Sequence, residues 1–531
     1  MGRHSHEAHM NGTGRATWFF PRVNGLELAV SMLVSFAVIF LFCLIDSRNF
    51  DWFLIPLFLS GVLCAADAIP WIRGTIDPFD PVGLIGFLGL HFFLVAPLLL
   101  ASSGPTFRVE DTVVPESRYW LGLMAWLNLG GLVLYKFGSH LAESAKGTFP
   151  RSTWGLGGRR ARIAVAVALA ACVVSQIIYF VGSGGFATYI NERVHGALGD
   201  SPTGYGPLMV LGQYVPILVL MAMTFLRKGG SSTLASPLNV ALVLVVVISI
   251  QFLITGLSGS RNSVIWTGFW TLGVIHFFWR PLSAKYMLLG IIPFIVYMYF
   301  LGFYKSLGGQ VLDYAKDSES LTDMEAASHR DFFSLFVGDL SRADVQAAEA
   351  YVIVTKPWEY GLSYGSTYLW SFAPFIPKAL WAGRPEDPGK VIAGTALLDG
   401  PRSYRTEDYV LRHSLGRRST RIYGLAGEAM LNFGLLGVPI AYLLWGLIVG
   451  RTRHFIERLD THDIRLFLVP FVVMLLFLLL VNDSDNIAAI SLFKFALPLV
   501  VLVVSATKSD PTGEVAADSQ VAASSHADGS L

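Results

Sequence analysis

Long apolar runs recur along almost the whole chain, and they constrain the fold more than any other feature. A run of about 18 or more apolar residues is long enough to cross a lipid bilayer as an α-helix. The composition agrees: 53% of the residues are hydrophobic and 15% are charged, whereas soluble domains carry about 25% charged residues. We therefore expect an all-α polytopic membrane protein, because helices satisfy their own backbone polar groups in lipid.

Apolar length predicts about twelve transmembrane helices. The expected spans are 26–45, 52–69, 82–101, 119–138, 163–181, 206–226, 237–256, 263–279, 285–304, 434–450, 465–481 and 487–506. The chain then divides into an N-terminal tail (1–25), a first group of spans (26–304), a large loop (305–433), a last group of spans (434–506) and a disordered tail (507–531).

Basic residues of the short loops set the expected orientation, because cytoplasmic loops carry an excess of Lys and Arg. If the N-terminus is cytoplasmic, the inside segments hold most of these residues, including Arg159, Arg160, Arg451 and Arg453. Both termini are therefore expected in the cytoplasm. The large loop is expected on the outer side of the membrane.

The large loop is more than a linker. Residues 328–354 have the apolar spacing of a helix, and Pro357 is expected to end it. The following stretch, 360–381, is dense in aromatic residues. These side chains fit an interfacial belt or core packing, and they also fit a platform that stacks on sugar rings.

Several arginines are candidates for binding an anion, because the guanidinium presents a fork of donors that matches phosphate oxygens. Arg261 lies in a Gly/Ser-rich turn between two apolar spans, where it could also serve as an interfacial anchor. A like-charged cluster before the chain returns to the membrane consists of Arg412, Arg417, Arg418 and Arg421. A solvated face is the alternative interpretation of that cluster.

Three residues are candidates for a general base. His413 lies within the arginine cluster, and its ordinary pKa suits proton transfer. Asp339 and Arg342 are spaced to share one face of a helix, either as a surface pair or as a carboxylate held by an arginine. Glu428 precedes the returning span, where burial would raise the pKa of its carboxyl; a carboxylate at the start of a helix with no chemical role is the alternative.

Other chemistries lack their motifs. The sequence contains no Walker loop, no His-Glu-x-x-His, no Gly-x-Ser-x-Gly and no dinucleotide-binding fingerprint. The three cysteines, Cys43, Cys64 and Cys172, all fall in apolar spans. We therefore expect no metal, no cofactor and no nucleic-acid partner. The segment Asp483-Ser484-Asp485 is interpreted as a turn or as a polar contact to substrate.

Three segments resemble a known family. They are Phe375-Ile376-Pro377-Lys378-Ala379-Leu380-Trp381 with Gly383-Arg384-Pro385, Glu428 to Gly437 containing Asn432-Phe433-Gly434, and the turn Gly259-Ser260-Arg261. Together with the large outer loop they resemble the Wzy-type O-antigen and oligosaccharide repeat-unit polymerases. Lys378 stands where that pattern more often has Arg.

The resemblance implies a GT-C-like glycosyltransferase of the bacterial inner membrane that works without a metal or cofactor. It would transfer a growing glycan from undecaprenyl diphosphate to a second lipid-linked repeat unit, with a flippase and a chain-length regulator as further partners. Glu428, His413 or Asp339 would take the proton of the acceptor hydroxyl. The predicted substrate-binding residues are Arg261, Arg342, Arg384, Arg417, Arg418, Arg421 and Asn432.

Two other functions fit parts of the same pattern. A ligase of the O-antigen type would move glycan from the same lipid carrier to a different acceptor. A polysaccharide transporter or flippase would carry no chemistry and would show internal repeats and charges in mid-membrane. The charged residues within the spans lie mostly near their ends, with Lys494 the deeper exception.

Overall fold

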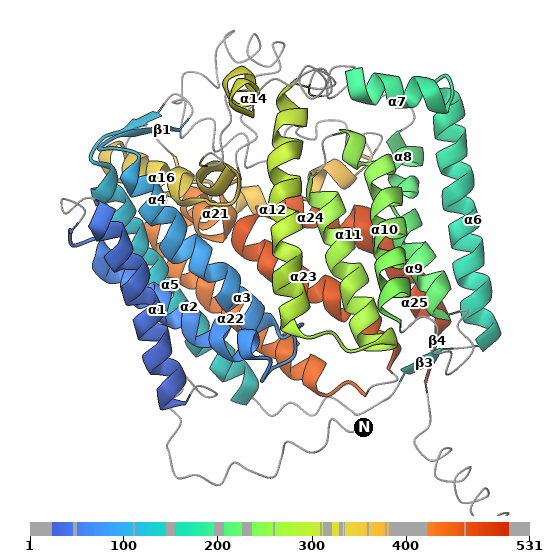
Figure 1. Ribbon diagram of the computed structural model, residues 1–531, viewed down its shortest axis with the longest axis horizontal. Helices are drawn as coiled ribbons and strands as arrows, with labels where there is room; N and C mark the ends of the chain where they lie inside the picture. The colour runs from blue at the N-terminus through green and yellow to red at the C-terminus, as the bar shows by residue number, and fades with distance from the viewer. Residues whose placement is uncertain are drawn as a thin grey trace, which may run out of the picture.

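The computed structural model of the protein describes most of the chain. The described residues are 24–45, 50–109, 112–144, 154–156, 158–195, 206–225, 236–258, 261–307, 311, 321–328, 333, 335–357, 361–376, 380–381, 422–460 and 463–508. Most of the predicted tails 1–25 and 507–531 and much of the large loop lie outside this part. Within it the structure is almost entirely helical (Figure 1).

The helices follow the apolar runs of the sequence, and η marks short 3₁₀ or π segments. The first group is α1 (Gly25–Ile45), α2 (Leu54–Arg73), α3 (Pro81–Leu90), η3 (His91–Val95), α4 (Ala96–Ser102), α5 (Ser117–Ser144), α6 (Gly158–Gly182), α7 (Phe186–His195), α8 (Gly206–Gly212), α9 (Val215–Phe225), α10 (Pro237–Ile254), η5 (Gly256–Ser258), α11 (Arg261–Val274), η6 (Ile275–Trp279) and α12 (Ala284–Leu307). The second is α14 (Leu321–Ser328), η7 (Leu335–Asp339), α16 (Ala343–Thr355), α17 (Ser366–Trp370), η8 (Ala373–Phe375), α21 (Gly424–Phe433), η9 (Gly434–Leu436), α22 (Gly437–Glu457), η10 (Ile464–Phe467), α23 (Val469–Val481), α24 (Ser484–Ile490), η11 (Ser491–Phe495) and α25 (Ala496–Ser505).

Two short antiparallel strand pairs complete the described structure. Strand β1 (Phe107–Val109) pairs with β2 (Thr112–Val114), and β3 (Trp154–Leu156) pairs with β4 (Ala506–Lys508). The second pair ties the start of α6 to the end of α25, at the end of the bundle opposite α7 and α14 (Figure 1).

The prediction of a multi-pass membrane protein is confirmed. In the described residues, ten helical runs are long and apolar enough to cross a membrane. Their surfaces are apolar too: α1 exposes Leu33, Phe36 and Leu41. The expected spans at 263–279 and 465–481 correspond to the shorter helices α11 and α23, so the total of twelve stays a prediction.

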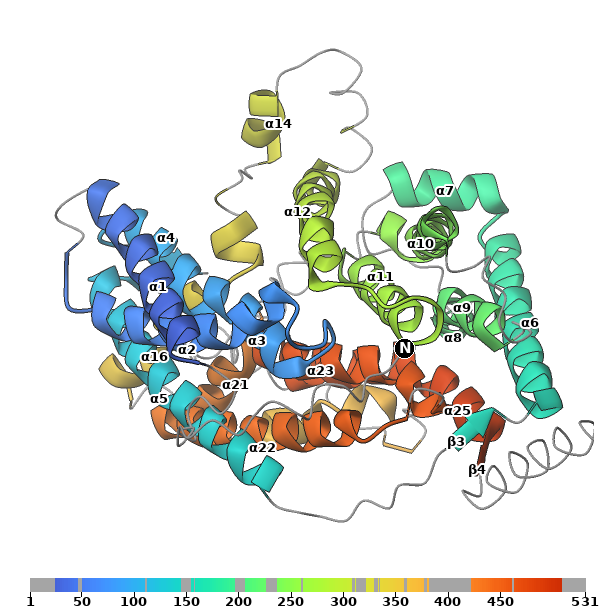
Figure 2. The same ribbon diagram turned by 60° about the horizontal axis from the view of Figure 1, so that its bottom comes forward.

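Helices α5 and α22 form the closest pair in the bundle, and Figure 2 shows them side by side. Small residues allow this approach, as in other membrane helix pairs. A Cβ atom at Gly446 would lie 2.2 Å from the carbonyl oxygen of Tyr135, and a Cβ at Gly450 would lie 2.4 Å from that of Ser139. Both positions therefore require glycine, because any side chain there would clash with the backbone of α5.

Buried ion pairs join the same helices. Lys136 of α5 pairs with Asp67 of α2. Arg453 of α22 lies 2.7 Å from Asp80, which precedes α3. Because an uncompensated charge inside a membrane is costly, each of these charges is retained with an opposite charge beside it. The pairs link α2, α3, α5 and α22.

The predicted helix over 328–354 is wrong. The chain forms α14, the π-helix η7 and α16 instead, and residues 329–332 lie outside the described part. Arg342 has φ −133° and precedes α16 rather than lying within a helix. Asp339 and Arg342 therefore do not share one helical face, because the helix is interrupted between them.

Candidate functional site

Four segments that are distant in sequence meet at the end of the bundle that carries α14. They are α16, α17, α21 and the turn between α23 and α24. The turn fixes the start of α21: Asp483 is fully buried, and its Oδ1 accepts the backbone N–H groups of Tyr423 at 2.8 Å and Gly424 at 2.9 Å. Gly424 has φ +71°, and a Cβ there would lie 2.8 Å from the Leu480 carbonyl oxygen.

Glu428 lies at the centre of this region. Its side chain is 3% exposed. Oε1 accepts the hydroxyl of Thr367 at 2.9 Å and the hydroxyl of Ser484, and Oε2 accepts the backbone N–H of Ser484 at 2.7 Å. The three donors satisfy a buried carboxylate, which would otherwise be expensive to remove from water. Glu428 therefore connects α21 to α17 and to the start of α24.

Asn432, one turn after Glu428, holds the loop segment 364–367 in place. Its Nδ2 donates to the Thr367 hydroxyl at 2.7 Å and to the Glu428 carbonyl at 2.8 Å. Its Oδ1 accepts the Gly365 N–H at 2.9 Å, and its carbonyl accepts the Tyr364 N–H. Asn432 thus uses both ends of its amide to fix the turn that begins α17.

Glu349 of α16 is the unusual member of the site. It is fully buried, and within the described part of the chain neither of its carboxyl oxygens has a hydrogen-bond partner. It packs closely against α21, since a Cβ at Gly427 would lie 2.7 Å from Oε2. Burial, and then the nearby carboxylates of Asp483 and Glu428, raise the pKa of Glu349 well above its ordinary value. Its neutral form is therefore favoured.

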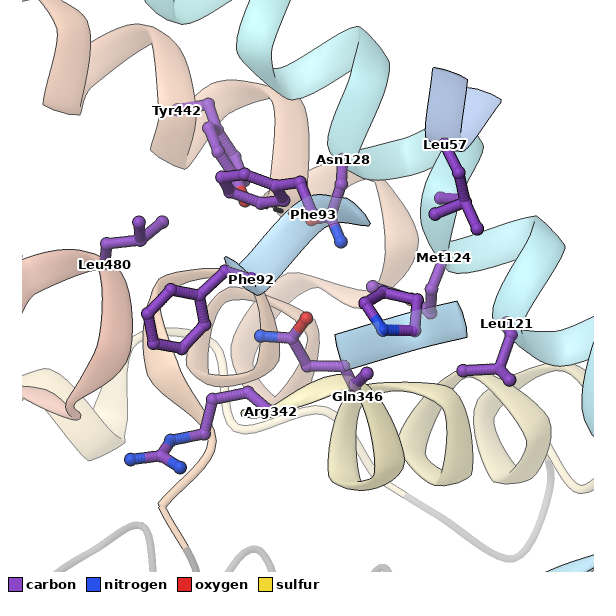
Figure 3. A pocket seen from close by; sticks show the side chains of 13 residues that line it. Leu57, Phe92, Phe93, Leu121, Met124, Asn128, Arg342, Gln346, Tyr442 and Leu480 are labelled. Atoms are coloured by element: carbon purple, nitrogen blue, oxygen red, sulfur yellow. Dashed lines mark hydrogen bonds between the residues drawn. The ribbon is translucent and has the colours of Figure 1, made fainter. Parts of the chain in front are cut away.

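A cavity of about 30 Å³ lies between the start of α16 and the membrane helices (Figure 3). Gln346 extends towards it, and Arg342 lies at its edge. The Arg342 Nε donates to the Val481 carbonyl at 2.9 Å, and Gln346 donates to the Tyr423 carbonyl at 3.0 Å. The other lining residues are mainly apolar: Leu57, Phe92, Phe93, Pro97, Leu121, Met124, Ala125, Asn128, Ala343, Tyr442 and Leu480.

The structure brings together Glu428, Asn432 and Arg342 among the residues predicted from sequence. Asp339 ends η7 and Arg261 begins α11, but their side chains lie outside the described part. The remaining predicted residues are also outside it: Arg384, His413, Arg417, Arg418 and Arg421. No group of three or more His, Cys, Asp or Glu residues that could hold a metal ion occurs in the part of the chain that the structure describes.

Sequence reasoning missed Glu349 and Thr367. Neither belongs to a motif, and their contribution depends on which helices meet. Asp483 and Ser484 belong to the segment interpreted as a turn or as a polar contact to substrate. The structure shows a turn before α24, in which Asp483 accepts the N–H of Tyr423 and Ser484 donates to Glu428. The contact to substrate stays a prediction.

No family model, no curated protein and no solved structure matches this chain. The resemblance to the repeat-unit polymerases therefore stays a hypothesis based on the quoted segments. The described site must be interpreted from its own chemistry.

Proposed function

We propose that this protein is a polymerase of lipid-linked oligosaccharide repeat units, of the kind that builds O-antigen, capsule or exopolysaccharide. The observation that carries the proposal is the polar site around Glu428, which is assembled at one end of an apolar helix bundle. Arg342 lies beside it, at a cavity lined by membrane helices. A cation between a polar site and apolar helices suits a ligand with an anionic group on a hydrocarbon chain.

The reaction needs three parts. The acceptor hydroxyl oxygen attacks the anomeric carbon of the donor sugar, and the bond from that carbon to the lipid diphosphate oxygen breaks. A base takes the hydroxyl proton, and cations stabilise the charge that develops on the leaving diphosphate. Arg342, Arg261 and the cluster Arg417, Arg418 and Arg421 are proposed to supply those cations.

The geometry favours a positioning role for Glu428. Three donors already occupy its oxygens, so its carboxylate is held between the loop and α24, and taking a proton would disrupt one of these bonds. His413 and Asp339 are therefore proposed as the candidate bases. Glu428 and Asn432 would hold the loop turn at 363–367 in place around the reacting groups.

We propose the inner membrane of a bacterium as the location, with both termini in the cytoplasm and the site on the outer side. This agrees with the placement of the start of α1 and of β4 at the same end of the bundle, opposite α7 and α14 (Figure 1). Cysteine-labelling of introduced residues from each side of the membrane would test the orientation.

The experiment for the function is glycan chain length on a gel from a strain that lacks the protein. The expected result is single repeat units in the null strain, a ladder restored by the wild type, and loss of that ladder in Arg261→Ala at an equal amount of folded protein. Full-length polymer that stays on its lipid carrier in the null strain would show a ligase. Repeat units trapped on the cytoplasmic side would show a flippase.

A further inference from the structure

Lys494 is a charged residue that the proposed reaction leaves without a role. It lies in the apolar helical run Ser484–Ser505, which is long enough to span a membrane. Its Nζ is shielded from solvent and has no hydrogen-bond partner among the residues that the structure describes. Two buried cations of the spans, Lys136 and Arg453, each have a carboxylate beside them. Lys494 is therefore an exception to the compensation seen elsewhere in the bundle.

The backbone around Lys494 departs from α-helical geometry, as it does at three other π-helical turns of the described structure, η3, η6 and η7. Residues Ser491–Phe495 form the π-helix η11 between α24 and α25. Such wide turns are rare in proteins, and many of those that occur lie at functional sites. The wide turn exposes backbone oxygens as well, because the Leu492 carbonyl accepts the hydroxyl of Tyr214. A polar position is thus built into an apolar helix at this point.

The large loop reaches this turn from the site described above. Ser371 of the loop is hydrogen-bonded to Ser484, and Phe375 contacts Phe493 edge to face with ring centroids 5.7 Å apart. The loop segment therefore follows the helix from its start to the turn that holds Lys494. At about 1.5 Å per residue, Lys494 lies on the order of 15 Å along the helix from Ser484.

We propose that Lys494 binds a phosphate group of a lipid whose hydrocarbon chain lies against the apolar helices. A buried cation without an internal partner fits an anion supplied by a ligand. The surrounding helices are apolar, which favours a phosphate carried on a hydrocarbon chain over a free phosphate. This assignment rests on the proposed function and specifies a residue that would hold the lipid carrier.

The test is a direct binding measurement on the full chain in detergent micelles. The probes are farnesyl diphosphate, farnesol and inorganic pyrophosphate. The variants are Lys494→Met, Lys494→Arg and the control Lys285→Met, which removes an exposed lysine at the start of α12. We expect Lys494→Met to weaken farnesyl diphosphate binding by about tenfold or more. Lys494→Arg, Lys285→Met and all farnesol binding should change little.

Equal binding of farnesyl diphosphate by Lys494→Met and the wild type would overturn the proposal. Equally tight binding of pyrophosphate alone would overturn the assignment to a lipid. The free energy of unfolding of Lys494→Met should not fall, because the substitution removes an uncompensated buried charge; a clear fall would reveal an internal partner and overturn the proposal. If binding depends on Lys494 but the protein makes no glycan ladder, the proposed polymerase function is refuted and the proposed phosphate site at Lys494 is not.

Discussion

Replacing Glu428 by Ala should destabilise the protein strongly, because three donors lose their common acceptor. A hydrogen bond to a charged group contributes about 1.5–3 kcal/mol, and a buried N–H left without an acceptor costs about 1–3 kcal/mol. Glu428 accepts the two hydroxyls of Thr367 and Ser484 and the N–H of Ser484. Since bonds to one side chain are not additive, we expect a loss of about 3–6 kcal/mol rather than their sum.

The assay is SDS titration of the purified protein in mixed micelles, followed by tryptophan fluorescence. Glu428→Gln should lose less, because its amide oxygen still accepts a bond while its NH₂ cannot accept from the Ser484 N–H. The control is Glu457→Ala, whose side chain is 44% exposed and lies 3.5 Å from Arg453. Arg453 keeps Asp80 at 2.7 Å, so we expect a loss of about 0–1 kcal/mol from removing the exposed partner. A loss below about 1 kcal/mol for Glu428→Ala would refute the reasoning.

Three further predictions concern other parts of the structure. Gly446→Ala should prevent accumulation of folded protein, measured by gel filtration in detergent, whereas Gly130→Ala should be tolerated because nothing lies within 4 Å of a Cβ there. Lys136→Met should cost about 3–5 kcal/mol in SDS titration by leaving Asp67 unpaired, and adding Asp67→Leu should recover most of that loss. Burial raises the pKa of Glu349 in the folded state, so wild-type stability should fall as pH rises from the unfolded value of about 4.3 through the raised value. The advantage of Glu349→Gln should therefore grow over that range, and a constant difference would contradict the prediction.

The helical membrane architecture was predictable because each span is encoded locally by its apolar run. The long stretch 434–450 was identified, but its helical run begins at Gly424. The reason is tertiary: Asp483, from a distant turn, accepts the first N–H groups of α21 and allows a helix to start there. The polar loop context of Glu428 in the sequence gave no sign of that partner.

The site was predictable in part for the same reason. Glu428 and Asn432 belong to one contiguous segment, and their spacing of one helical turn is visible in the sequence. Glu349 has no such signal, because its significance lies in the absence of any donor near its two oxygens. The break between η7 and α16 was likewise missed: Ser341 and Arg342 interrupt the apolar residues there, and the Ser341 hydroxyl accepts the N–H of Ala343 at 3.0 Å where α16 begins.

The donors of Glu428 imply that the loop and the last membrane helix become ordered together. Thr367 comes from the loop, and Ser484 begins the helix that carries Lys494. Ser484 donates to both carboxylate oxygens, and Thr367 of the loop adds a second donor to Oε1, so the carboxylate joins the loop to the start of α24. Burying a carboxylate is favourable only when its bonds are complete. A change at Glu428 should therefore disturb the loop contact with η11 as well, and phosphate binding at Lys494 should weaken in Glu428→Ala although the two residues are far apart along the helix.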